Sequence, residues 1–293
     1  MTRYGWTGSR VSSPVSDLRT DGPVLLAGAC DESRYGGKAV QLGEAVRAGL
    51  PVPPGVALPV SLVEALVRGR PEARRCVELA RDQLGAGALA VRSSAVGEDG
   101  DGASFAGQHA SVLNAADVVD AVLQVARSAS DASAAAYRSR LGRPAGTAIG
   151  VVLQRLVAAE VAGVLFTCDP VSGRDELVVE ASWALGEAVV SGLVSPDFYR
   201  LTPHGQLLQV CAGHKDSAVV ALPGGGTAVV GVDAVRARQS CLDNGHLKAL
   251  VALATRVREV WPGHSDLEWA YGPDGLALLQ RRPVTTGPGR PGA

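Results

Sequence analysis

An alternating pattern of polar side chains near the end of the sequence constrains this chain most strongly. Asp266 and Glu268 are two residues apart, and Gln280 and Arg282 repeat this spacing a short distance later. Residues two apart in an extended strand point to the same face. The intervening sequence Tyr-Gly-Pro-Asp-Gly at 271–275 is typical of a turn. The pattern predicts two neighbouring strands that direct two carboxylates, an amide and a guanidinium into one site.

These side-chain types suit the chemistry of a magnesium nucleotide. Carboxylate oxygens such as those of Asp266 and Glu268 are the ligands that a hard cation prefers. A guanidinium such as that of Arg282 forms paired hydrogen bonds with phosphate oxygens. Taken alone, the pattern allows any magnesium-dependent enzyme that uses a nucleotide.

The overall composition favours a globular protein without a large charged surface. The chain has 293 residues, of which 46% are hydrophobic, enough to bury a core in one large domain or two modest ones. A formal net charge of −1 argues against nucleic-acid binding. The five cysteines are scattered, and no run approaches the roughly 18 apolar residues of a membrane span. We expect a cytoplasmic protein with reduced thiols that binds neither nucleic acid nor membrane.

The order of the expected elements favours an α+β fold. Apolar strands and amphipathic helices follow one another without a strict βαβ repeat, and a helix is expected over 183–190. The Arg-Pro-Ala-Gly sequence at 143–146 indicates a subdomain boundary. We expect the following parts: an N-terminal arm at 1–22, a first lobe at 23–145, a second lobe at 146–286 and a tail at 287–293.

Three upstream segments carry further candidate groups. Lys38 follows two glycines at the start of an expected helix, where backbone N–H groups and the ammonium favour an anion. Arg92 and Ser93 follow an apolar strand expected over 88–91 and precede a loop of small residues whose amides suit phosphate. Gln154 ends an apolar strand that suits an adenine slot. Each pattern is common by itself, so an exposed lysine, a surface loop and a plain strand end are the more frequent interpretations.

The motifs also occur in a characteristic order: Gly36-Gly37-Lys38, Val91-Arg92-Ser93-Ser94, Ala103-Ser104-Phe105-Ala106-Gly107-Gln108, Asp169-Pro170-Val171, Leu185-Gly186-Glu187, Asp266-Leu267-Glu268 and Gln280 followed by Arg282-Pro283. This order strongly resembles the N-terminal ATP-binding domain of phosphoenolpyruvate synthase, pyruvate phosphate dikinase and rifampicin phosphotransferase. The resemblance covers 23–286, nearly the whole chain. One departure is Ala184, which stands where a glycine is common in the family.

The resemblance implies an ATP-grasp fold, with two α+β lobes that enclose a cleft for ATP and Mg²⁺. It implies five catalytic residues, which are Lys38, Arg92, Glu268, Gln280 and Arg282. Of these, Glu268 and Gln280 would bind the metal. It also implies that residues 98–107 cover the phosphates and that the nucleotide contacts Lys38, Arg92, Ser93, Gly107, Gln154, Leu156, Val157, Asp266 and Arg282.

In the resembled family, ATP is cleaved to AMP, and the β-phosphoryl group passes to a histidine on a separate swivelling domain. Only 284–293 follow Pro283 in this sequence. We therefore expect an ATP-dependent phosphotransferase module, either standing alone or excised from a longer enzyme. Its acceptor is expected to be a histidine of a swivelling-domain protein or a small molecule. Two alternatives stay open: an ATP-grasp ligase that forms an acyl phosphate and releases ADP, and a non-catalytic ATP-binding remnant.

Overall fold

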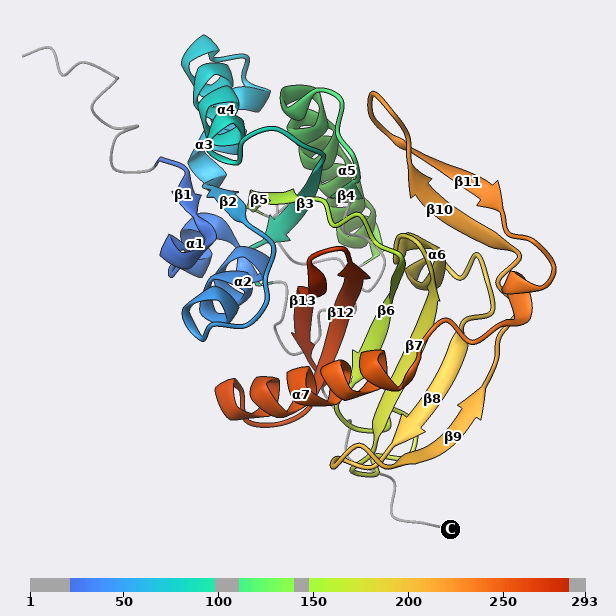
Figure 1. The fold of residues 1–293 in the computed structure, drawn as a ribbon. Helices are drawn as coiled ribbons and strands as arrows, with labels where there is room; N and C mark the ends of the chain where they lie inside the picture. Colours follow the sequence, from blue (N-terminus) through green and yellow to red (C-terminus); the bar gives the residue numbers. More distant parts are fainter. Residues whose placement is uncertain (1–21, 98–110, 140–147, 285–293) are drawn as a thin grey trace, which may run out of the picture.

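The computed structural model describes residues 22–97, 111–139 and 148–284, with only the backbone described for 130–139. Two antiparallel sheets and a separate two-stranded hairpin make up the β-structure (Figure 1). The strands are β1 (Val24–Leu25), β2 (Gly55–Leu58), β3 (Leu89–Ala95), β4 (Ser111–Val112), β5 (Ile149–Arg155), β6 (Val161–Phe166), β7 (Leu177–Trp183), β8 (Asp197–Leu201), β9 (Leu207–Cys211), β10 (Ser217–Ala221), β11 (Thr227–Gly231), β12 (Ser265–Gly272) and β13 (Gly275–Pro283). The helices are η2 (Leu26–Gly28), α1 (Glu32–Tyr35), α2 (Gly37–Arg47), α3 (Val60–Val67), α4 (Pro71–Gln83), α5 (Val118–Ser139), α6 (Glu187–Val190), η3 (Arg236–Arg238) and α7 (Asn244–Val260).

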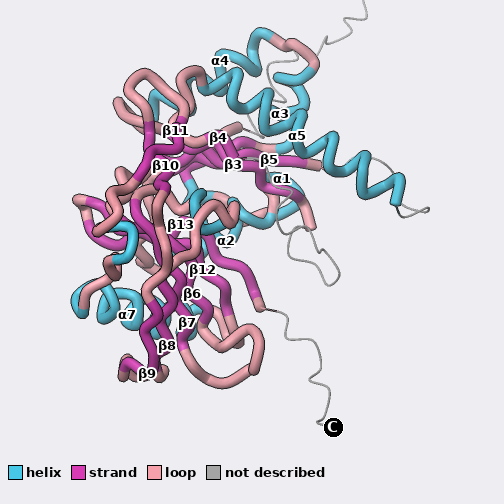
Figure 2. The backbone as a smooth tube through the Cα atoms, turned by 90° about the vertical axis from the view of Figure 1, so that its right-hand side faces the viewer, coloured by secondary structure: helices cyan, strands magenta, loops and turns pink. Residues whose placement is uncertain are grey.

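The first lobe is a five-stranded sheet in the order β1-β2-β5-β3-β4, covered on both faces. Side chains alternate along β3, so Val91 packs with α3, α4 and α5 in one core, together with Leu58, Leu62 and Val77. The opposite face packs against α1 and α2 through a smaller core that includes Val152. Figure 2 shows α3, α4 and α5 together on one side of this sheet. Arg92, the neighbour of Val91 in β3, therefore lies on the face that α2 covers.

The second lobe is a six-stranded sheet in the order β13-β12-β6-β7-β8-β9, with α7 against one face. Asp243 caps α7 by accepting the backbone N–H of His246 at 2.9 Å. Leu250 and Val257 of α7 pack with Leu267 of β12 in the largest core. Because side chains alternate along β12, Asp266 and Glu268 lie on the face away from α7.

The structure confirms the predicted α+β class, with two changes in the local elements. The helix expected over 183–190 is wrong in its first half, because β7 continues to Trp183 and α6 spans only Glu187–Val190. Between them, Ala184 has φ 61. This is the left-handed region that favours glycine, and a glycine at this point would be free of strain. The strand expected over 88–91 continues to Ala95.

The change from one sheet to the other comes later than the proline-glycine sequence at 143–146 indicates. β5 begins after that sequence, yet it pairs with β2 and β3 of the first sheet. We therefore propose that the first lobe extends through Arg155. The expected arm at 1–22 and the tail at 287–293 lie outside the described residues, apart from Gly22. The described residues contain no helix that combines the length and the apolar character of a membrane span.

The packing of α7 on β12 makes a direct prediction. Leu267 is 0% exposed, and its truncation in Leu267→Ala leaves a cavity that is expected to lower the free energy of unfolding by about 2–5 kcal/mol. Val171 is 95% exposed, so Val171→Ala serves as the control, with an expected change of within about 0.5 kcal/mol. Urea unfolding followed by circular dichroism measures both. Equal effects of the two substitutions would contradict the assigned core.

Candidate functional site

Arg92 joins the two sheets by hydrogen bonds. It lies within β3 and is 8% exposed. Its Nη2 donates to Glu268 Oε2 at 2.9 Å and to Gln280 Oε1 at 2.8 Å, and its Nη1 donates to the Leu279 carbonyl. The three acceptors belong to β12 and β13, so one guanidinium bridges the two lobes. A buried charge needs such paired acceptors to be stable. We call these four residues the interlobe cluster.

A β-bulge in β13 supplies one acceptor of the interlobe cluster. Glu268 pairs with Gln280, but the next residue, Trp269, pairs with Leu278, which leaves Leu279 as the extra residue. Such a bulge locally bends the strand and re-aims its side chains. Leu278 consequently packs in the core with Trp269, while Gln280 joins Glu268 on the opposite face.

The predicted pairing of the two polar strands is present in the structure. Asp266 pairs with Arg282, and Glu268 pairs with Gln280, across the β12–β13 ladder. Glu180 of β7 lies on the same face, because both Glu180 and Glu268 pair with one residue of β6 between them. Sequence reasoning missed Glu180. Its signal was a lone carboxylate within the apolar run 177–181.

Asp266 is a largely buried carboxyl group that retains its proton unusually well. Burial raises the pKa of Asp266 to about 6; Arg282 opposes this rise, and the carboxylates of Glu268 and Glu180 add to it. Its Oδ1 atom is buried and has no hydrogen-bond partner among the described residues. The carboxyl groups of Asp266, Glu268 and Glu180 thus share one face with Arg282, and neighbouring carboxylates favour a cation beside them.

Lys38 contacts the strand that carries Arg92. It is 6% exposed, and its Nζ donates to the Ser93 carbonyl at 3.0 Å. The turn before it packs closely on β3: Gly36 has φ +78, and a Cβ at this position would lie 2.0 Å from the Ser94 carbonyl oxygen. Glycine is therefore required here. The turn places Lys38 and the N-terminus of α2 beside the strand that carries Arg92.

One predicted nucleotide contact, Ser93, does not reach the interlobe cluster with its side chain. Ser93 points to the opposite face of β3 from Arg92, since neighbouring residues of a strand alternate. Its Oγ is buried without a partner in the described residues, and its carbonyl is the acceptor for Lys38. Gly107 and the predicted covering loop at 98–107 lie outside the described residues.

The expected adenine segment forms the connection between the two sheets. Gln154 lies near the end of β5, is 2% exposed, and donates from Nε2 to the Pro53 carbonyl at 3.3 Å. Leu156 packs against a small cluster that contains Leu185 and Val219. Val157 contacts the β12–β13 turn, where its Cγ1 would lie 3.0 Å from a Cβ on Gly272. The segment therefore touches both lobes, and its contact with adenine stays a prediction.

The oxygens of Glu268 and Gln280 fit a magnesium ion held together with a nucleotide. Mg²⁺ commonly takes one or two protein oxygens and completes its shell with phosphates and water. In the described ranges, no group of three or more His, Cys, Asp or Glu side chains could hold a metal by itself. Glu268 and Gln280 provide two oxygens on the same face as the unpartnered Oδ1 of Asp266. They match a metal site in which the protein and the nucleotide both supply ligands.

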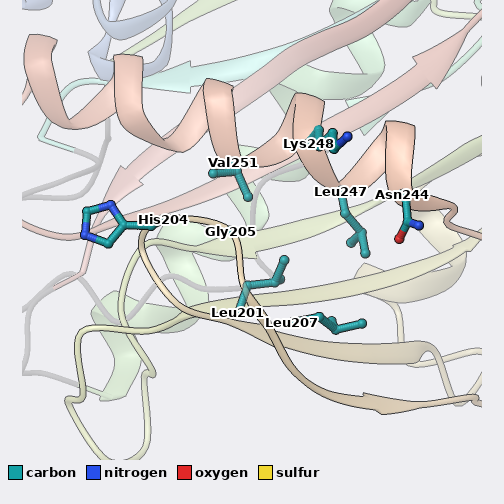
Figure 3. A pocket seen from close by; sticks show the side chains of 8 residues that line it. All are labelled: Leu201, His204, Gly205, Leu207, Asn244, Leu247, Lys248 and Val251. Atoms are coloured by element: carbon teal, nitrogen blue, oxygen red, sulfur yellow. The ribbon is translucent and has the colours of Figure 1, made fainter.

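A separate pocket of about 270 Å³ lies in the second lobe, between α7 and the β8–β9 turn. Figure 3 shows the residues that line it, which are Leu201, His204, Gly205, Leu207, Asn244, Leu247, Lys248 and Val251. α7 covers the sheet face opposite Asp266 and Glu268, so this pocket is remote from the interlobe cluster. It contains none of the residues predicted from the sequence.

Comparison with known proteins assigns the chain to a family. Residues 70–291 match the family described as pyruvate phosphate dikinase, AMP/ATP-binding domain. The chain belongs to this family. A rifampicin phosphotransferase from Streptomyces sp is 40% identical over 204 residues, covering 68% of this chain and 24% of that protein. A probable phosphoenolpyruvate synthase from Methanothermobacter thermautotrophicus is 32% identical over 311 residues, covering 88% of this chain and 45% of that protein.

The family match confirms the resemblance seen in the sequence. The chain is an ATP-binding domain of the phosphotransferase family, and it spans less than half the length of the two relatives. The solved structure of purK, an N5-carboxyaminoimidazole ribonucleotide synthetase in an ADP complex, is similar with a TM-score of 0.41 and 13% identity. That similarity covers 87% of this chain and 46% of the other.

The raised pKa of Asp266 predicts a pH-dependent stability. The ordinary pKa of an aspartate side chain is 3.8, and the pKa of Asp266 in the folded chain is about 6. Between these two pH values, the folded chain retains a proton that the unfolded chain has lost. The Asp266 contribution to the free energy of unfolding therefore falls as the pH rises through this window. Relative to the wild type, Asp266→Asn is expected to gain roughly 1–3 kcal/mol between pH 4 and pH 7.

Urea unfolding without nucleotide and with EDTA measures this gain. Asp274→Asn, in the exposed turn of the same hairpin, is the matched control and is expected to show no such change. A pH-independent difference between Asp266→Asn and the wild type would contradict the buried, protonated state.

Proposed function

We propose that this domain binds MgATP at the interlobe cluster and catalyses phosphoryl transfer from it, as the nucleotide-binding module of a phosphoenolpyruvate synthase-like or dikinase-like phosphotransferase. The observation that carries the proposal is the convergence of Arg92 with Glu268 and Gln280 from opposite lobes. Membership of the family supports a nucleotide as the ligand. The charged and polar groups of the interlobe cluster support the binding of its phosphates there.

Each residue has a proposed task. Lys38 and Arg92 hold phosphate oxygens from the first lobe, and Arg282 holds them from the second. Glu268 and Gln280 hold Mg²⁺, which supplies charge neutralisation on the phosphates when it is bound. Gln154, Leu156 and Val157 hold the adenine, and Asp266 contributes negative charge beside the metal ligands. Phosphoryl transfer depends mainly on positioning and charge neutralisation, and these groups provide both.

For the phosphoryl acceptor, we propose a chemical class and no specific molecule. The relatives are a rifampicin phosphotransferase and a probable phosphoenolpyruvate synthase. A histidine on a swivelling domain is the acceptor we favour, with a small molecule as the alternative. The products distinguish the mechanisms: AMP with phosphate follows from the dikinase type of cleavage, whereas ADP would favour a ligase that forms an acyl phosphate.

Glu268→Gln tests the assigned site. This substitution keeps the shape of the side chain and removes the charge that pairs with Arg92, so ATP cleavage is expected to fall by about 10²–10³-fold. Chromatography of AMP, ADP and phosphate, with and without a histidine-bearing swivelling domain, gives the rates. Glu259→Gln, on the exposed side of α7, is the control and should match the wild type. Unchanged ATP affinity and turnover in Glu268→Gln would show that the site is misassigned.

A further inference from the structure

The β10–β11 hairpin leaves the second lobe and reaches the first. Its two strands form a sheet of their own, and Val219 of β10 makes one isolated bridge to Ala184. Both views place the hairpin beside β4, at the edge of the first sheet (Figures 1 and 2). Hydrogen bonds and packing hold it at its tip, its middle and its base.

Asn114 holds the tip of the hairpin. It is 7% exposed, and its Nδ2 donates to the carbonyls of Leu222 and Gly226, both at 2.8 Å. The Gly226 N–H donates back to the Asn114 carbonyl at 2.7 Å. Gly225 also packs closely, since a Cβ there would lie 2.4 Å from the Cβ of Ala116. Three hydrogen bonds therefore join residues more than 100 positions apart.

The middle of the hairpin packs against the connection between the lobes. Val219 belongs to a small buried cluster with Leu185, and Leu113 and Leu156 pack against that cluster. The Val219 carbonyl also accepts the Leu185 N–H at 3.1 Å. The hairpin thus contacts the proposed adenine segment through Leu156 and the first lobe through Leu113.

A buried ion pair fixes the base of the hairpin. Lys215, two residues before β10, pairs with Asp197 of β8, and both side chains are 0% exposed. Asp197 also accepts the N–H groups of Gly213 and Cys241, each at 2.7 Å. Hydrogen bonds to the charged form hold the pKa of Asp197 below its ordinary value, although burial opposes them. An ion pair with these additional bonds has little freedom to move.

We infer that the β10–β11 hairpin is a brace that sets the spacing of the two lobes for ATP, and that Asn114 is its positioning residue. Asn114 follows β4, whose two residues pair with Val91 and Arg92. The brace therefore fixes the sheet edge beside the arginine of the interlobe cluster. Phosphate contacts from opposite lobes need a fixed spacing, because misplacement weakens every contact at once. The inference rests on the proposed ATP site.

Asn114→Gly tests the brace. Asn114 has φ 54, a left-handed conformation that glycine adopts freely, so the backbone is retained and two donors are lost. With the binding-competent spacing less populated, the Kd for ATP is expected to rise about 5–30-fold. Isothermal titration calorimetry measures this rise. Hydrogen exchange at the Gly226 amide, which bonds to Asn114, is expected to become faster.

Two controls separate positioning from general stability. Leu62→Ala removes a side chain that is 1% exposed in the helical core of the first lobe, so it destabilises without touching the brace and should leave the ATP Kd unchanged. Val229→Ser alters a residue of the same hairpin that is 60% exposed and should behave as the wild type.

The outcomes are distinct. Unchanged ATP affinity in Asn114→Gly, or an equal loss in Leu62→Ala, overturns the brace and leaves the proposed function standing. A wild-type chain that binds no ATP overturns the proposed function instead. A selective loss in Asn114→Gly supports the brace.

Discussion

The buried guanidinium of Arg92 is the interaction on which the arrangement of this domain depends. Burying a charge costs several kcal/mol unless acceptors replace the lost water, and the three acceptors of Arg92 do not come from the lobe that carries it. Glu268, Gln280 and the Leu279 carbonyl all come from the other sheet. Arg92 is satisfied only when the two lobes meet in one register, and the core around α7 likewise contains Ala45 and Leu50 of the first lobe. The bulge in β13 is part of this requirement, because it presents the Leu279 carbonyl to the cluster.

The same interaction joins groups that have separate tasks in the proposed function, where Glu268 and Gln280 are metal ligands and Arg92 is a phosphate ligand. Glu268 and Gln280 each accept a hydrogen bond from Arg92. Asp266 is the exception, since its Oδ1 has no partner among the described residues and burial raises its pKa to about 6. A bound cation would relieve that unfavourable burial. The buried carboxyl group of Asp266 and the proposed metal ligands therefore belong to one arrangement of charges.

Local sequence patterns predicted those features of the structure that depend on residues close together in the chain. The spacing of Asp266 and Glu268, with a turn before Gln280, was sufficient for the hairpin and for its polar face. Pairing between distant segments was not predictable in this way. The proline and glycine at 143–146 resemble a lobe boundary, but β5 returns to the first sheet through pairing with β2 and β3. Nothing in the two identical side chains of Leu278 and Leu279 shows which one is the extra residue of the bulge.

Asn114 shows most clearly why part of the site was invisible in the sequence. Its neighbours, Leu113 and Ala115, give it no motif, and a lone asparagine after a short strand is ordinary turn chemistry. Its importance comes from two carbonyls of a distant hairpin, and that hairpin depends in turn on the buried pair of Asp197 and Lys215. Groups that bind phosphate occur in recognisable local sequence patterns. Groups that set the distance between lobes need only match their partners in the folded chain, so they have no such pattern. Under the proposed function, the spacing of the ATP site therefore depends on contacts that appear only once the chain has folded.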